Sequence, residues 1–190
     1  MARERVEDRK KKLIPLCRKA VKLYKRSLAN KTTRIDCLDG YRLIILWPEN
    51  RIMHLCGITG CTRPPEYVSK GPHHMGEADY FYKMLAKPKG RLASRSLVVA
   101  DFRQAESKLN VLPYMLEEFH TAIGVVDSSK QEIDFFVGDT VWCLGLFHDV
   151  VLSTKHGMTV YIPRSFIPAS LCRKREPDKR FHIIERIVTV

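Results

Sequence analysis

Residues 121–147 read TAIGVVDSSKQEIDFFVGDTVWCLGLF. Short apolar runs alternate in this stretch with polar residues such as Asp127-Ser128-Ser129, and the runs are 122–126, 133–137 and 141–147. Apolar runs of this length, bounded by turn residues, are typical of β-strands. Two further runs follow at 158–162 and 181–190, so the sequence predicts a sheet formed mainly by the later part of the chain.

The earlier part of the chain has helical periodicity. Residues 16–29 place apolar side chains on one stripe, and residues 77–86 and 102–119 do the same, the last with a break near Pro113. Pro15 predicts a first turn or a kink, so residues 3–14 are expected to form a separate helical arm. Helices mostly before strands indicate an α+β fold with an antiparallel sheet rather than a doubly wound α/β fold.

One hairpin is expected among these helices. Residues 41–47 and 51–56 have the composition of strands, and Pro48-Glu49-Asn50 supplies turn residues between them. Residues 57–76 are rich in Gly, Pro and polar residues and are expected to form a long exposed loop. Loops of that length are often functional.

The charge of the chain favours a polyanionic partner. Lysine and arginine outnumber aspartate and glutamate by 33 to 21, the net charge is +12, and residues 1–26 alone hold eleven basic and three acidic side chains. We predict a basic arm over residues 1–15, followed by a single domain over residues 16–190. The predicted nucleic-acid-binding residues are Arg9, Lys10, Lys11, Lys12, Arg18, Lys22, Arg173, Lys174 and Arg175. The alternative for the charge run is a solvated helix face that keeps the protein soluble.

The location of the protein is predicted from what the sequence lacks. No stretch has the length of a transmembrane helix, and the first residues lack the apolar region of a secretory signal. A membrane-binding helix needs large apolar side chains opposite its lysines, whereas the opposite stripe here suits packing on a core. Six scattered cysteines show no disulfide framework, so we expect a reduced cytoplasmic protein without a membrane partner.

The sequence contains no glycine-rich phosphate loop, dinucleotide fingerprint, paired-histidine zinc helix or serine elbow. Its densest group of reactive side chains is His54, Cys56, Cys61, His73 and His74. These residue types can hold zinc, but adjacent histidines do not easily both ligate and no second cysteine pair follows. Buried thiols and a solvent-facing histidine pair are therefore favoured, and neither a metal nor a cofactor is predicted.

Several short segments carry a family resemblance by their order. They are 53–58 (MHLCGI), 80–83 (YFYK), 108–113 (KLNVLP), 136–138 (FVG), 144–147 (LGLF), 161–166 (YIPRSF) and 183–187 (IIERI). In this order they resemble the phage-associated Barnase-EndoU-Colicin-RelE-like nucleases, in the fourth phage group. The resemblance covers about residues 16–190. Cys56 stands where the family commonly has a threonine.

The resemblance implies N-terminal helices packed on a curved, mainly antiparallel sheet. It also implies a metal-independent ribonuclease that acts as a toxin or in conflicts between phages, plasmids and hosts. RNA is then the expected partner, and the ribosome and a cognate inhibitor protein are further candidates.

Such an enzyme needs a base for the ribose 2′-OH, an acid for the leaving oxygen and cations for the phosphorane. His54 is the first candidate for acid or base because imidazole titrates near neutrality, with a core histidine as the alternative. Lys83 and Lys108 are candidate phosphate clamps, and surface solvation is the alternative for each. Ser165 could donate to a phosphate oxygen, although a helix cap is favoured for it.

Three hypotheses about function follow. The first is a ribonuclease that uses His54 and lysines. The second is a basic binding module that has the nuclease fold without its activity. The third is a zinc-organised interaction domain, which would contain stoichiometric zinc and would unfold with a chelator.

Overall fold

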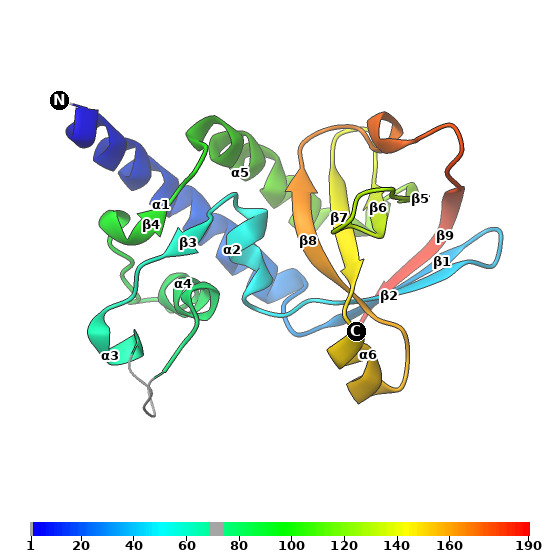
Figure 1. Cartoon of the computed structure of the whole chain (residues 1–190), viewed down its shortest axis with the longest axis horizontal. Helices are drawn as coiled ribbons and strands as arrows, with labels where there is room; N and C mark the ends of the chain where they lie inside the picture. The colour runs from blue at the N-terminus through cyan, green and yellow to red at the C-terminus, as the bar shows by residue number, and fades with distance from the viewer. Residues whose placement is uncertain (1, 69–73) are drawn as a thin grey trace.

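The computed structural model describes residues 2–68 and 74–190, with the backbone alone for residues 2–4. Figure 1 shows a group of helices on one side of the molecule and a β-barrel on the other. The structure confirms the α+β class with a mainly antiparallel sheet. The sheet is curved so strongly that its seven strands form a closed barrel.

Helix α1 (Ala2–Ser27) is the longest helix of the described chain and runs through Pro15. The helix start expected at that residue, and the separate arm over residues 3–14, are therefore wrong. Proline has no backbone N–H and so cannot donate a hydrogen bond to the carbonyl four residues earlier. Here that carbonyl belongs to the exposed Lys11, and water can donate to it instead. Side chains of α1 before Pro15 contact the rest of the fold: Arg9 pairs with Glu106 at 3.3 Å, and Leu13 lies in the core.

The other two long helices are α4 (Glu77–Ala86) and α5 (Phe102–Glu117). The predicted helix over 77–86 is confirmed at both ends. Asp101 caps α5 by accepting a 3.0 Å hydrogen bond from the backbone N–H of Gln104. Helix α5 runs through Pro113 without the expected break and ends at Glu117, before a 3-10 turn η2 (Phe119–Thr121).

The barrel has the strand order β1-β2-β8-β7-β6-β5-β9. Its strands are β1 (Thr32–Cys37), β2 (Arg42–Leu46), β5 (Gly124–Asp127), β6 (Phe135–Gly138), β7 (Cys143–His148), β8 (Tyr161–Ile167) and β9 (Phe181–Thr189). All neighbours are antiparallel except β2 and β8, which meet at Ile45 and Tyr161. The five late apolar runs are thus confirmed as strands, with ends that differ by a few residues.

The predicted hairpin of residues 41–47 and 51–56 is wrong. Strand β2 pairs with β1, and residues 51–55 form the short helix α2 (Arg51–Leu55). Buried Ile52, Met53 and Leu55 lack the alternation that a half-buried strand requires. Strand β1 was missed because one of its three inward residues is the polar Thr33, which leaves only Ile35 and Cys37 as an apolar pattern.

Smaller elements fill the remaining chain. They are β3 (Gly60–Cys61), α3 (Pro65–Val68), η1 (Ser94–Ser96), β4 (Leu97–Val98), α6 (Val150–His156) and η3 (Leu171–Lys174). The expected loop over 57–76 therefore contains a strand and a helical turn, and its residues 69–73 lie outside the described chain. Ser165 lies in β8 opposite Gly145, so the expected helix cap at this residue is wrong.

A buried hydrogen-bond chain links the first and last strands. The indole N–H of Trp47 donates to the hydroxyl of Thr33 at 2.8 Å, and that hydroxyl lies 2.8 Å from the hydroxyl of Thr189. Both Trp47 and Thr33 are almost fully buried. Because a buried donor without an acceptor is costly, this chain helps to fix β9 beside β1.

We expect Thr33→Val to lower the free energy of unfolding by about 1–3 kcal/mol, because the Trp47 N–H loses its acceptor at nearly constant side-chain volume. Urea denaturation measures the loss. Thr32→Val, on the same strand with its side chain on the other face, is the control and should change little. Equal losses in the two variants would contradict this role of Thr33.

A second prediction concerns Gly57, which follows α2 with φ +78°. A Cβ atom here would lie 2.9 Å from the Ala105 Cα atom and 3.2 Å from Lys108 Cδ. We expect Gly57→Ala to destabilise the fold by about 1 kcal/mol or more beyond the backbone strain of about 1–2 kcal/mol. Gly40→Ala carries only the strain, because Gly40 has φ +80° and open space around it. Denaturation midpoints of the two variants test this; a smaller effect at Gly57 would show that α2 and α5 need not approach so closely.

Candidate active site

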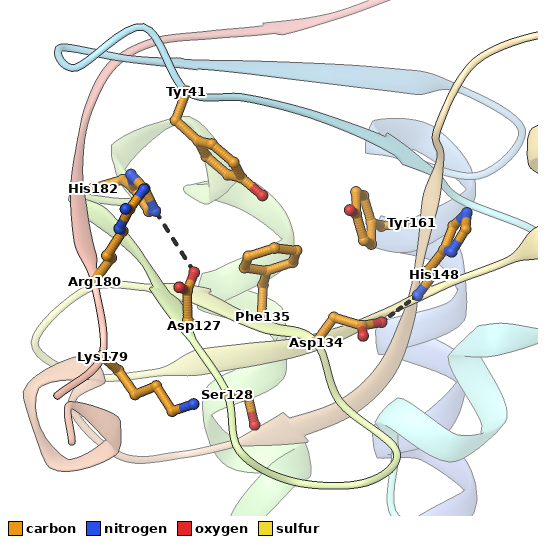
Figure 2. Close-up of a pocket in the computed structure, with 10 residues that line it drawn as sticks. All are labelled: Tyr41, Asp127, Ser128, Asp134, Phe135, His148, Tyr161, Lys179, Arg180 and His182. Carbon is orange, nitrogen blue, oxygen red and sulfur yellow. Dashed lines mark hydrogen bonds and ion pairs between the residues drawn. The ribbon is translucent and has the colours of Figure 1, made fainter.

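A cleft of about 410 Å³ lies among strand ends of the barrel. The residues that line it come from the β1–β2 turn, the ends of β5 and β7, the starts of β6, β8 and β9, and the segments between them. They are Tyr41, Asp127, Ser128, Asp134, Phe135, His148, Tyr161, Lys179, Arg180 and His182. Figure 2 shows their side chains around a common space, with Phe135 between the two histidine-bearing sides.

His182 is held by carboxylates on both ring nitrogens. Its Nδ1 atom lies 2.6 Å from Oδ2 of Asp39, and its Nε2 atom lies 3.6 Å from Oδ1 of Asp127. The hydrogen bond to His182 lowers the pKa of Asp39 below its usual value. An ionised carboxylate only accepts hydrogen bonds, so Nδ1 carries the proton and Nε2 faces Asp127 (Figure 2).

The ring of His182 is also fixed by stacking. Tyr41 lies over it with ring centroids 4.2 Å apart and planes 17° apart, and only 5% of the His182 side chain is exposed. Offset stacking and a carboxylate on Nδ1 together set the orientation of the imidazole. The arrangement is that of a carboxylate–histidine pair that can take up or release a proton at Nε2.

Local backbone geometry brings Asp39 to His182. The register of β1 against β9 shifts by a bulge between Asp36 and Cys37. The turn that follows contains Gly40 at φ +80°, and Oδ1 of Asp39 accepts a 3.2 Å hydrogen bond from the backbone N–H of Tyr41. Asp39 thus uses one oxygen for the turn and the other for the imidazole.

The other side of the cleft carries His148 and Tyr161. The Nε2 atom of His148 lies 2.9 Å from the hydroxyl of Ser153, which also accepts a 2.9 Å hydrogen bond from the backbone N–H of Val160. The backbone N–H of His148 donates to Asp134 at 2.6 Å. Burial raises the pKa of both Tyr41 and Tyr161, so their phenols stay protonated and can donate hydrogen bonds.

Cations of the C-terminal segment lie beside the cleft. Lys179 and Arg180 line it. The predicted binding residues Arg173 and Lys174 belong to η3. Lys174 lies over the ring of Phe136 at 5.7 Å, and Arg175 over that of Phe181 at 5.5 Å. The structure thus places the predicted C-terminal basic residues next to strands that form the cleft.

The four residues predicted to be catalytic do not form one site. His54 is exposed on α2 and lies close to the buried Lys108, so the core-histidine alternative is wrong. Partial desolvation, Arg51, Arg164 and Lys108 all lower the pKa of His54. Lys83 lines a separate hollow with Lys25, Glu49, Asp79 and Tyr82. Ser165 is in β8. None of the four is among the residues that line the cleft.

The predicted basic residues of α1 fall into two groups. Arg9 pairs with Glu106 and lies 4.5 Å from the Phe102 ring centroid, and Arg18 donates to the carbonyls of Lys87 and Gly90. These two arginines therefore hold the helix to the fold. Lys10 is half-buried, and Lys11, Lys12 and Lys22 are exposed. Figure 1 shows that the N-terminal end of α1 lies far from the barrel.

The predicted alternative of a zinc centre falls partly outside the described chain, because His73 lies there. Within the described residues, no three His, Cys, Asp or Glu side chains gather as metal ligands. Cys56 is buried beside Cys17, whereas Cys61 lies near Glu77. No helix in the described part of the chain combines the length and apolar character needed to cross a membrane.

Sequence reasoning missed the cleft because its main pair is distant in sequence. His182 and Asp39 are 143 residues apart, and only the β1–β9 pairing joins them. The available signal was His182 near the start of a predicted strand. No pattern connected it to Asp39.

Comparison with known proteins gives one family. The profile described as "phage-Barnase-EndoU-ColicinE5/D-RelE like nuclease4" matches residues 17–187. No curated protein and no solved structure matches the chain. Since the match spans most of the 190 residues, the resemblance predicted from the ordered segments is confirmed. The chain belongs to the phage-Barnase-EndoU-ColicinE5/D-RelE like nuclease4 family and is of the nuclease kind.

Proposed function

We propose that the chain is a metal-independent endoribonuclease whose active site is the cleft of the barrel. The observation that carries the proposal is the Asp39–His182 pair, with Nε2 of the imidazole beside Asp127 in a cleft that also holds cations. A nuclease without a metal needs a proton acceptor near the nucleophile, and this pair supplies one. The ribose 2′-OH is the nucleophile, which makes RNA the substrate.

The proposed reaction is a transfer within the RNA strand. Nε2 of His182 takes the proton of the 2′-OH while O2′ forms a bond to phosphorus and the bond from phosphorus to O5′ breaks. The leaving O5′ receives a proton from His148 on the other side of the cleft (Figure 2). Asp127 stabilises the imidazolium that forms on His182. The products are a 2′,3′-cyclic phosphate and a 5′-hydroxyl.

Charge on the phosphorane is stabilised by groups that are already in place. Lys179 and Arg180 are the cations of the cleft, and the neutral phenols of Tyr41 and Tyr161 are hydrogen-bond donors. Such preorganised donors are often the largest contribution to catalysis. The Phe135 ring offers a surface on which a base can stack.

The proposed biological role follows the family name. We propose that the enzyme acts in the cytoplasm as a toxin, or in conflict between phage and host, with the ribosome or an inhibitor protein as further partners. The competing functional hypothesis is a basic module that binds RNA without cutting it. A competing catalytic assignment uses His54, which the sequence favours.

The first test is RNA cleavage in the presence of a chelator. We expect His182→Ala to reduce kcat/KM about 10²-fold or more, because general acid–base catalysis contributes about 10²–10⁴-fold. Asp39→Asn should cause a smaller loss, because the ring keeps a neighbour but loses the carboxylate. His120→Ala is the control: His120 is 67% exposed and is not among the residues that line the cleft.

Two results would contradict this assignment. If His54→Ala abolished cleavage while His182→Ala did not, the acid–base residue would be His54. If the wild-type protein bound RNA and cut none, the binding module would be correct. RNA affinity measured on each variant separates a loss of chemistry from a loss of binding.

The second test concerns the lysines of α1. Replacing Lys10, Lys11 and Lys12 by glutamine should reduce the slope of log K against log salt by about 0.7 for each phosphate of single-stranded RNA that these lysines neutralise. Substitution is preferable to deletion because Arg9 holds α1 to α5. Circular dichroism should show the same helix content as in the wild type. An unchanged slope would mean that these lysines do not bind the nucleic acid.

A further inference from the structure

A second group of basic side chains lies where the helices meet the barrel. We call Arg51, His54, Lys108 and Arg164 the seam cluster; they come from α2, α5 and β8. The guanidinium carbons of Arg51 and Arg164 lie 5.8 Å and 5.9 Å from the ring centroid of Phe147 in β7. Gly57 lets α2 approach α5 so closely that a Cβ atom at this position would clash with Ala105 and Lys108.

The seam cluster lacks matching negative charge. Within the described residues, Arg51, His54 and Lys108 make no ion pair, and the buried Nε atom of Arg51 has no hydrogen-bond partner. Lys108 is only 8% exposed. Arg164 pairs at 3.0 Å with Glu132, whose side chain is 74% exposed, and Asp149 is the acid that acts on Arg51. Like charges held together in this way destabilise the free protein, and an anion would relieve the repulsion.

The position of the seam cluster relates it to the cleft. Phe147 pairs with Ile162, and the next pair along the same two strands, His148 and Tyr161, lines the cleft. Successive residues of a strand point to opposite faces about 3.3 Å apart along its length. Phe147, against which the two arginines of the cluster lie, and His148, which lines the cleft, are therefore adjacent residues on opposite faces of the β7–β8 pair. A nucleic-acid strand that passes around the end of this pair can contact both.

We propose that the seam cluster binds a backbone phosphate of the same nucleic-acid strand that the cleft cuts, outside the nucleotides that react. The identity of the ligand rests on the proposed function. Guanidinium groups suit this task because they donate two parallel hydrogen bonds to a phosphate. His54 and Lys108 then act in binding rather than in proton transfer.

The pKa of His54 should show whether a phosphate is bound to the seam cluster. Burial and the charges of Arg51, Arg164 and Lys108 lower its pKa, while Asp149 and Glu132 are the acids nearest the two arginines. A bound phosphate offsets these cations, so the pKa of His54 should rise when the ligand binds. Replacing Arg164 removes one cation and should raise the pKa of His54 in the free protein.

The experiment uses the full chain and an all-deoxy single strand, which has no 2′-OH and cannot be cut by the proposed route. Arg164→Gln, at an exposed position, should weaken binding about tenfold and reduce the salt slope by about 0.7. Glu132→Gln should tighten binding, because Arg164 is freed from its partner. Arg103→Gln, an exposed arginine of α5, is the control and should bind as the wild type does.

Nuclear magnetic resonance of the His54 ring gives the second measurement. A rise of its pKa on adding the deoxy strand, together with the loss of affinity in Arg164→Gln, supports the site. Two results would overturn the proposed phosphate site. One is an unchanged affinity for the deoxy strand in both Arg164→Gln and Arg51→Gln, and the other is a His54 pKa that does not change when the strand is added. If the wild type did not cut RNA, the proposed ribonuclease function would be wrong. The phosphate site would still be testable, because this binding assay does not depend on cleavage.

Discussion

The pairing of β1 with β9 is the constraint on which the site depends. It joins residues near the start and the end of the chain, closes the barrel, and sets Asp39 against His182 at 2.6 Å. Without this register, the cleft would lose the carboxylate that holds the imidazole. The buried contact of Trp47, Thr33 and Thr189 stabilises the same pairing, so stability and the geometry of the site share one element.

The cleft and the seam cluster hold basic side chains in different surroundings. Lys179 and Arg180 line the cleft together with carboxylates and phenols. Such a mixture of charged and hydrogen-bonding groups can stabilise charge that develops during a reaction. In the seam cluster, the buried Lys108 lies among like charges, as suits the binding of a fixed anion. Desolvation, followed by the charges of Arg51, Arg164 and Lys108, lowers the pKa of His54, and such perturbed groups are frequent at functional sites.

Local patterns predicted much of the fold but little of the site. The helix over 77–86 and the five late strands follow from apolar periodicity and turn residues, which are local properties. Strand β1 did not, because its inward residues include the polar Thr33 and only two apolar side chains. Helix α2 was mistaken for a strand because five residues are too few to establish a period. The Asp39–His182 pair depends on barrel closure, which no local pattern contains. His54 and Lys108 were singled out for their chemistry, and the structure brings them together, but neither is among the residues that line the cleft.

In the proposed mechanism, the cleft uses a 2′-OH as the nucleophile, with no metal. The most direct measurement uses a DNA strand that contains one ribonucleotide, incubated with the protein and a chelator, and analyses the ends of the fragments by mass spectrometry. We expect a single cut after the ribonucleotide, with a 2′,3′-cyclic phosphate on one fragment and a 5′-hydroxyl on the other. Cuts at deoxynucleotides, or fragments that begin with a 5′-phosphate, would contradict it.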